Sequence, residues 1–464
     1  MPTRIRLITM LVLACLSSAP LAANLTLPAI FSDHMVLQRN AEVTIWGWGK
    51  AQEPVKLSAS WAPGEVWEQQ IGPLGRWSFT ITTPDEAGPF SLDIQGYNQL
   101  RIEDVLLGEV WLCSGQSNME WSVNLGIDEG EAEAAAADYP EIRLFTVRHK
   151  TSDFPQDDLP GEWVKCSPAT IRDFSAVGYF FGRHLHQELD VPVGLILSAW
   201  GGTPAEVWLS ADRVRSDRLL REAAATLQPQ PWGPKDPGLA FDAMLCPLAP
   251  YRIAGALWYQ GESNTGYPQT YARLLETLID DWRARWGYDF PFYIAQIAPY
   301  AGYGDDNIRG GILRDQQRRV VAATEDTGLV VVADIGDLDN IHPTNKQDVG
   351  LRFARLALAR QYGFELGLVE GPLYQRHEQS GNELTVYFSQ AEGGLVADGP
   401  LTGFELAGPD GQFHPAEARI QGETVVLHSA AVPLPQYLHY AMGNTAVHSL
   451  FNRAGLPASC FTTE

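Results

Sequence analysis

Five short polar segments along the chain carry residue types that could perform acyl transfer. The first is Gly115-Gln116-Ser117-Asn118, which follows an apolar run ending at Cys113. A serine on a tight turn after a buried strand is rigid and exposed, as a nucleophile must be. Met119 stands where a Gly-x-Ser-x-Gly elbow would have its second glycine. The segment therefore indicates either a serine hydrolase outside the α/β-hydrolase type or a simple turn.

A candidate base and candidate orienting carboxylates lie near residue 340. His342 would accept the proton of Ser117, and Asp339, three residues before it, would fold back to hold the imidazole. Such a carboxylate fixes the histidine tautomer and stabilises the imidazolium as it forms. Asp337 and Asp334 are rival orienting groups, although aspartates here could equally cap helices or form turns. The alternative for His342 itself is a loop histidine without a catalytic role.

Acyl transfer also needs hydrogen-bond donors for the oxyanion. The backbone amides of Ser117 and Gly202 are two candidates, the latter within Gly201-Gly202, which could also be only a tight turn. A side-chain amide would be the third donor, with Asn264 as the first choice and Gln260 as the second.

Two charged residues are candidates for substrate contacts. Glu262 could bind the substrate, hydrogen-bond the serine loop, or be a buried structural carboxylate. Arg314 could meet an acidic sugar, but we rank a surface ion pair above that role. No cysteines and histidines have the spacing of metal ligands, so we expect neither a metal nor another cofactor.

The polar segments follow apolar runs typical of buried strands. These runs cover residues 105–112, 193–197, 253–259, 292–296 and 329–333. Helix-like stretches alternate with them, and the clearest, about residues 269–286, has apolar residues at helical spacing. This alternation predicts an α/β domain with a parallel sheet over residues 100–363. Function gathers at the carboxyl ends of such strands, so the polar segments should meet there.

The two flanks have a different pattern. Residues 24–99 and 364–464 contain short alternating segments separated by turn residues. This predicts an N-terminal β-domain and a C-terminal β-region. We expect the two to pack together.

Residues 1–23 have the pattern of a secretory signal peptide. Arg4 and Arg6 precede an apolar run and small residues, and cleavage is expected after Ala22 or Ala23. The protein should be exported to the periplasm or beyond the cell; lipoprotein processing at Cys15 ranks second. The run is too short to span a bilayer, and no later stretch looks transmembrane.

The charge of the chain restricts its partners. The formal net charge is −23, and loss of the two arginines with the signal peptide makes it −25 (−23 − 2). So negative a chain is a poor partner for nucleic acids or anionic membranes. A neutral glycan is compatible with this charge.

Four ordered segments resemble the sialate O-acetylesterase family of the SGNH-hydrolase superfamily, which is related to acetylxylan esterases. They are Gly115–Met119, Trp200–Pro204, Trp258–Asn264 and Asp339–Pro343, and residues 31–38 and 450–457 are similar to the family too. The resemblance implies a flavodoxin-like α/β/α domain and a serine esterase without metal. It places the nucleophile on Ser117, the Asp-x-x-His pair on Asp339 and His342, and the second-block glycine on Gly202. The third block, Gly261–Asn264, is one residue longer than the Gly-x-Asn of the superfamily.

The sequence therefore predicts an exported serine esterase that removes O-acetyl groups from sugars through an acetyl-serine. The alcohol would be a sialic acid or a xylose-type unit of a plant polysaccharide. A non-catalytic glycan-binding protein is the alternative from another class, and a serine peptidase is a third reading.

Overall fold

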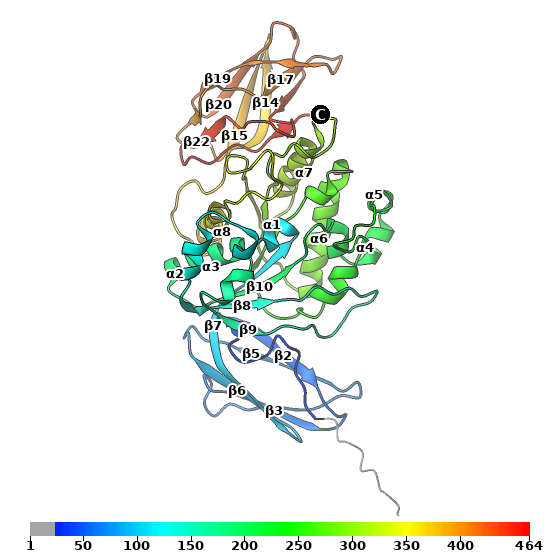
Figure 1. The fold of residues 1–464 in the computed structure, drawn as a ribbon, viewed down its shortest axis with the longest axis vertical. Coiled ribbons are helices and arrows are strands. Elements are labelled where there is room, and N and C mark those ends of the chain that lie inside the picture. Colours follow the sequence, from blue (N-terminus) through cyan, green and yellow to red (C-terminus); the bar gives the residue numbers. More distant parts are fainter. Residues whose placement is uncertain (1–23) are drawn as a thin grey trace, which may run out of the picture.

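The computed structural model describes residues 24–464, so the predicted signal peptide lies outside the described residues. A parallel sheet forms the centre of the molecule (Figure 1), in the strand order β13-β12-β11-β7-β10-β8-β9. Only β9 in this order is antiparallel to its neighbour. The strands are β7 (Gln99–Gly115), β8 (Tyr139–Thr146), β9 (Trp163–Cys166), β10 (Val193–Ala199), β11 (Gly255–Tyr259), β12 (Phe292–Ala295) and β13 (Thr327–Val330).

Helices cover both faces of this sheet. Successive side chains of a strand point to opposite faces, so each strand packs against helices on both sides. Trp111 and Cys113 of β7 belong to the cluster that includes α3 (Ala176–Leu189) and α8 (Gln347–Arg360). Leu112 belongs to the other cluster, with α6 (Tyr271–Trp286) and α7 (Arg309–Ala323). This arrangement confirms the predicted α/β domain. The shorter helices are α1 (Ser117–Glu120), α2 (Gly130–Ala136), α4 (Ala211–Ser216) and α5 (Arg218–Ala224).

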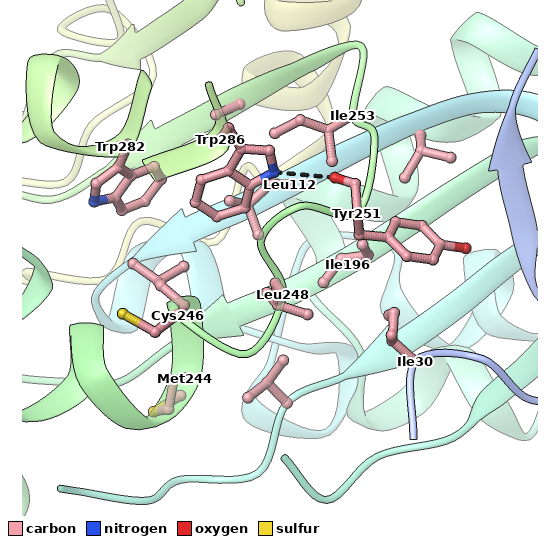
Figure 2. Packing of buried hydrophobic residues seen from close by; sticks show 14 of the residues in the cluster. Ile30, Leu112, Ile196, Met244, Cys246, Leu248, Tyr251, Ile253, Trp282 and Trp286 are labelled. Carbon is pink, nitrogen blue, oxygen red and sulfur yellow. Dashed lines mark hydrogen bonds between the residues drawn. The ribbon is translucent and has the colours of Figure 1, made fainter. Parts of the chain in front are cut away.

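The predicted helix near residues 269–286 is α6, and its aromatic stripe packs on the sheet. Trp282 is fully buried, and the indole of Trp286 donates a hydrogen bond to the carbonyl of Tyr251, 3.0 Å away (Figure 2). Leu112 and Ile196, from β7 and β10, lie in the same cluster. These aromatic residues are part of the core, as their spacing predicted. Truncating one of them to alanine would lower the free energy of unfolding by about 3–5 kcal/mol.

The N-terminal β-region is joined to the central sheet by one continuous strand. The first part of β7 pairs antiparallel with β6, and its middle pairs parallel with β1. The last part of β7 lies between β10 and β11. The N-terminal strands are β1 (Val36–Gln38), β2 (Glu42–Trp48), β3 (Pro54–Ala59), β4 (Trp67–Gln70), β5 (Arg76–Thr82) and β6 (Phe90–Gln95).

The C-terminal β-region lies at the opposite end of the molecule (Figure 1). Its two larger sheets have the orders β14-β15-β20-β19 and β18-β17-β21-β23, and neither includes an N-terminal strand. The expectation that the two β-regions pack together is therefore wrong, because the α/β domain separates them. The strands are β14 (Leu373–Ser380), β15 (Glu383–Ser389), β16 (Leu395–Ala397), β17 (Phe404–Ala407), β18 (Phe413–Pro415), β19 (Glu417–Gln421), β20 (Thr424–His428), β21 (Tyr437–Tyr440), β22 (Leu450–Asn452) and β23 (Phe461–Thr462).

Helix α7 attaches the C-terminal β-region to the centre. A Cβ atom on Gly311 would lie 1.7 Å from the carbonyl oxygen of Met442, so only glycine permits this approach. Three residues further on, Arg314 is fully buried and donates hydrogen bonds to the carbonyls of Ala441 and Gly443, at 3.4 and 2.7 Å. Arg314 therefore binds the C-terminal region, and neither a substrate contact nor a surface ion pair is its role in this structure.

Within residues 24–464, no helix combines the length and apolar character needed to cross a bilayer. The four cysteines of this range are buried free thiols. Burial raises the pKa of the Cys113 thiol to about 12, which makes this thiol unreactive at neutral pH.

Gly311→Ala should destabilise the packing of α7 on the C-terminal region. The added methyl group would clash with a backbone carbonyl that cannot rotate away. We expect the free energy of unfolding to fall by about 1–3 kcal/mol. Gly443→Ala is the matched control in the same interface, because its Cβ would have 3.6 Å to the nearest atom. Thermal unfolding of both variants checks this, and equal midpoints would contradict it.

Candidate active site

Ser117 and His342 come together at the carboxyl end of the sheet. Ser117 is the first residue of α1, separated from the end of β7 by one residue, and His342 lies in the loop between β13 and α8. Ser117 Oγ and His342 Nε2 are 2.8 Å apart, although 225 residues separate them in sequence. This is the distance required between a serine nucleophile and its general base.

The surroundings of His342 keep its ring neutral. The ring stacks on Trp121, with centroids 4.0 Å apart and an interplanar angle of 18°. Burial, and secondly the positive charge of Lys346, lower the pKa of His342 to about 4. At neutral pH the imidazole is therefore uncharged, and Nε2 can accept the proton of Ser117.

The three candidate carboxylates have different partners. Asp337 accepts hydrogen bonds from the backbone amides of Asp339 and Asn340, at 2.9 and 3.2 Å. Asp334 forms an ion pair with Arg352. Asp339 is exposed, and within residues 24–464 its carboxylate forms no hydrogen bond with His342. The structure thus removes Asp334 as an orienting group and leaves Asp339 as a prediction.

Two residues with candidate oxyanion amides, Ser117 and Gly202, line the same cavity. Gly202, just after β10, lines the same cavity as Ser117 and has a φ of +73°, which favours glycine. A Cβ atom on Gly202 would lie 2.1 Å from Nε1 of Trp232, so the position also lacks room for a side chain. The Ser117 amide opens a helix and so has no intrahelical acceptor. Both amides are available to a developing oxyanion.

The structure does not bring Asn264 and Gln260 into the cavity, where the sequence placed one of them. The amide oxygen of Asn264 accepts hydrogen bonds from Gln260 Nε2 at 2.7 Å and from the backbone of Ala205 at 2.9 Å. Asn264 Nδ2 donates to Glu206 at 2.8 Å, and Gln260 Nε2 also donates to the carbonyl of Thr203 at 3.2 Å. Their amide groups form hydrogen bonds with residues 203–206, which directly follow Gly202. They therefore fix the oxyanion loop, the segment that carries the Gly202 amide, without lining the cavity themselves.

A side-chain amide does line the cavity, and it belongs to Gln116. Its Oε1 accepts hydrogen bonds from the backbone amides of Ser263 and Gly261, at 3.2 and 3.4 Å. Within residues 24–464 its Nε2 has no hydrogen-bond acceptor, and Gln116 lines the cavity beside Ser117. Gln116 is therefore a third candidate for an oxyanion donor, and its place next to the nucleophile was a usable signal in the sequence.

The cavity has a volume of about 650 Å³ and an aromatic wall. Trp200 stacks on His149, with centroids 4.3 Å apart, and Trp200 Nε1 donates to the carbonyl of Trp232 at 2.7 Å. Glu120 binds His149 at 2.8 Å and accepts a hydrogen bond from the Gly201 amide at 2.7 Å. The sequence analysis missed His149, Trp232 and Glu120, because they come from loops and a short helix without a motif of their own.

Glu262 is the predicted substrate-contact residue that does line the cavity, although its side chain is largely buried. Burial raises the pKa of its carboxyl group. Within residues 24–464, no three His, Cys, Asp or Glu side chains gather closely enough to hold a metal ion.

The family model of sialic acid-specific acetylesterases, which are carbohydrate esterases, matches residues 107–360. The chain belongs to this family. The match includes Ser117, Gly202 and His342, so the residues brought together at the sheet edge lie within the family domain. The sialic acid-specific acetylesterases are serine hydrolases, and this chain is accordingly a serine carboxylic-ester hydrolase.

Relatives extend the similarity beyond the central domain. The chain is 30% identical to sialate O-acetylesterase of Mus musculus, and the alignment covers 75% of each protein. It is 29% identical to that of Homo sapiens, over 75% of this chain and 73% of the human one. A carbohydrate acetylesterase from Xanthomonas citri is 34% identical, with a TM-score of 0.86, and the alignment covers 95% of this chain and 99% of that one. The α/β domain of the present chain has an SGNH-like fold, as the motifs in its sequence implied.

The pH dependence of the esterase should have its acid limb well below the ordinary range of histidine. The base works only when neutral, so kcat/KM should rise with pH around the pKa of His342, about 4. It should then be flat between about pH 6 and pH 8. Hydrolysis of p-nitrophenyl acetate against pH measures this, and an acid limb near the usual histidine pKa of 6.5 would contradict it.

Proposed function

We propose that this protein is an exported serine esterase that hydrolyses O-acetyl esters on sugars through an acetyl-serine intermediate. The observation that carries the proposal is the 2.8 Å separation between Ser117 Oγ and Nε2 of a neutral His342, beside two available backbone amides. Export rests on the signal-peptide pattern of residues 1–23.

The reaction follows from the positions of these groups. His342 Nε2 takes the proton of Ser117 as Oγ attacks the acetyl carbonyl. The amides of Ser117 and Gly202, with Gln116 Nε2, donate to the oxyanion, and removing one such donor costs about 10²–10³ in rate. His342 then protonates the departing sugar oxygen. Water, deprotonated by His342, attacks the acetyl-serine, so that acetate leaves and Ser117 is restored.

Asp339 completes this scheme as the group that holds the imidazolium. Within residues 24–464, His342 Nδ1 forms no hydrogen bond, and Asp339 stands three residues earlier in the same loop with an unpaired carboxylate. We propose that the two groups pair when the ring becomes charged, since apo geometries of catalytic hydrogen bonds are often long.

Asp339→Asn should therefore lower kcat by about 10²-fold or more, because the amide cannot stabilise the imidazolium. Asp337→Asn is the matched control, since an asparagine oxygen can still accept the two backbone amides that Asp337 binds. Steady-state kinetics on an aryl acetate compare the two variants. If Asp337→Asn shows the larger loss, Asp337 is the orienting carboxylate.

The charge of the cavity favours a neutral acetylated sugar as a second candidate for the substrate. Of the described residues that line the cavity, Glu120 and Glu262 are acidic, while Lys235 is the one lysine or arginine. Lys235 lies 3.4 Å from Asp236, so part of its charge is already compensated. A sialic acid carries a carboxylate, and this cavity offers it no guanidinium clamp. An acetylated xylan lacks that carboxylate.

The deciding measurement is acetate release by the mature protein from acetylated xylan and from 9-O-acetylated sialic acid, beside Ser117→Ala. We expect release that is lost in Ser117→Ala and that is faster from the neutral substrate. No release from either substrate or from an aryl acetate would overturn catalysis and support the glycan-binding alternative.

Salt separates the charge effect from the shape of the cavity. The net charge of the mature chain, −25 (−23 − 2), repels an anionic sugar, and salt screens that repulsion. Raising NaCl should therefore increase kcat/KM for the acetylated sialic acid and leave that for acetylated xylan unchanged. Equal responses of the two substrates would show that the charge of the chain does not select the sugar.

A further inference from the structure

Three polar residues, Asn118, Glu262 and Lys346, form a buried cluster next to the catalytic pair, which we call the Asn118 cluster. Their exposed fractions are 1%, 6% and 1%. We propose that the Asn118 cluster positions the catalytic base: it ties the His342 loop to the serine helix and fixes the positive charge of Lys346 near the imidazole. The inference rests on the proposed role of His342 as that base.

The side-chain amide of Asn118 joins three segments of the chain. Its Nδ2 donates to the carbonyl of Ile341, the residue before His342, at 3.0 Å. The same nitrogen donates to Glu262 Oε1 at 2.5 Å, on the 3₁₀ turn Glu262–Asn264. Its Oδ1 accepts from Lys346 Nζ at 2.6 Å, just before α8. Because Asn118 follows Ser117 directly, the amide connects the nucleophile to the loop of its base.

Stability alone gives no reason for this cluster. Burying a carboxylate and an ammonium group is unfavourable for each, and an apolar set of the same volume often packs as well or better. Lys346 is also the N-cap residue of α8, where the helix dipole disfavours a cation. Burial lowers the pKa of Lys346 to about 7 and raises that of Glu262. A buried charge held against these penalties points to a task at the site.

The Asn118 cluster fixes the orientation of His342 and helps to keep its imidazole uncharged. The charged or titratable groups that line the cavity are Glu120, Glu262, Lys235 and His149, and those in the loop of His342 before Lys346 are Asp334, Asp337 and Asp339. Burial is the largest cause of the lowered pKa of His342. The second cause is the positive charge of Lys346, which is not in this set. The ring is held by stacking on Trp121 and by the bond of Asn118 to the preceding carbonyl.

The test follows the reaction of Ser117 with a fluorophosphonate across pH in the mature full chain, which needs no sugar substrate. Lys346→Met should move the midpoint of the acid limb up by about one pH unit, because the imidazole regains basicity. Lys346→Arg keeps the charge and should leave the midpoint in place. Lys165→Met, at a half-exposed lysine paired with Asp104, is the control for removal of a distant lysine.

An unmoved midpoint in Lys346→Met would overturn the electrostatic part of the proposal. If thermal unfolding shows that Lys346→Met does not fold, the double variant Lys346→Met/Glu262→Gln replaces it. Lys346→Met alone leaves the buried carboxylate of Glu262 without a neighbouring cation, whereas the double variant removes both charged groups. Its midpoint should also lie above that of wild type.

Asn118→Ala tests the positioning part. We expect its labelling rate on the plateau to fall at least about tenfold, a part of the roughly 10²–10⁴-fold that a positioned base contributes. Asn118→Asp keeps the size of the side chain but loses the bond to Ile341, and it should show a similar loss. Asn124→Ala, which removes a bond to Asp173 away from the cavity, should label like wild type.

The outcomes separate this inference from the proposed function. If a folded Asn118→Ala and Asn118→Asp label at the wild-type rate, the Asn118 cluster does not position His342, while the esterase proposal stands. If wild-type Ser117 itself fails to react, the catalytic proposal falls, and the inference falls with it.

Discussion

The structure depends on β7, the strand that spans Gln99–Gly115 and ends at the nucleophile. One end of this strand belongs to the N-terminal β-region, and the other lies between β10 and β11 in the central sheet. All of its last eleven residues are buried, so its side chains are fixed by packing on both faces. Ser117 follows after one further residue. The nucleophile therefore follows a stretch of backbone that is buried throughout, and the catalytic loops pack around the end of that strand.

Two sets of buried polar side chains hold those loops in place. Gln260, Asn264 and Glu206 hold the segment after Gly202, where the oxyanion amide lies. Asn118, with Glu262 and Lys346, holds the segment that contains His342. Both sets stand where an apolar core would be simpler. The hydrogen bonds of such a buried network make it rigid, and a loop that is otherwise exposed gains a fixed geometry from them, although within residues 24–464 Glu262 Oε2 forms no hydrogen bond.

The sequence predicted those features that depend on local pattern. The apolar runs gave the strands, and the polar residues after them gave Ser117, Gly202 and His342, because parallel strands bring their carboxyl ends to one edge. What it could not give was the direction of each side chain. Gln116 and Asn264 are both amides in matching motifs, yet the first lines the cavity and the second points into the packing behind it. Arg314 was expected at the surface, because nothing local shows that the C-terminal region covers α7.

Residues 225–238, which contribute Trp232 to the cavity, include no helix or strand. The segment is joined to the rest of the wall by the hydrogen bond from the Trp200 indole to the Trp232 carbonyl, and the Trp232 side chain is 57% exposed. Such a segment tolerates insertions and replacements, because few buried contacts depend on its sequence. The shape of the mouth can thus diverge between homologues while β7, the oxyanion loop and the histidine loop stay unchanged. The cavity wall around Trp232 and the catalytic residues therefore lie in separable parts of this chain.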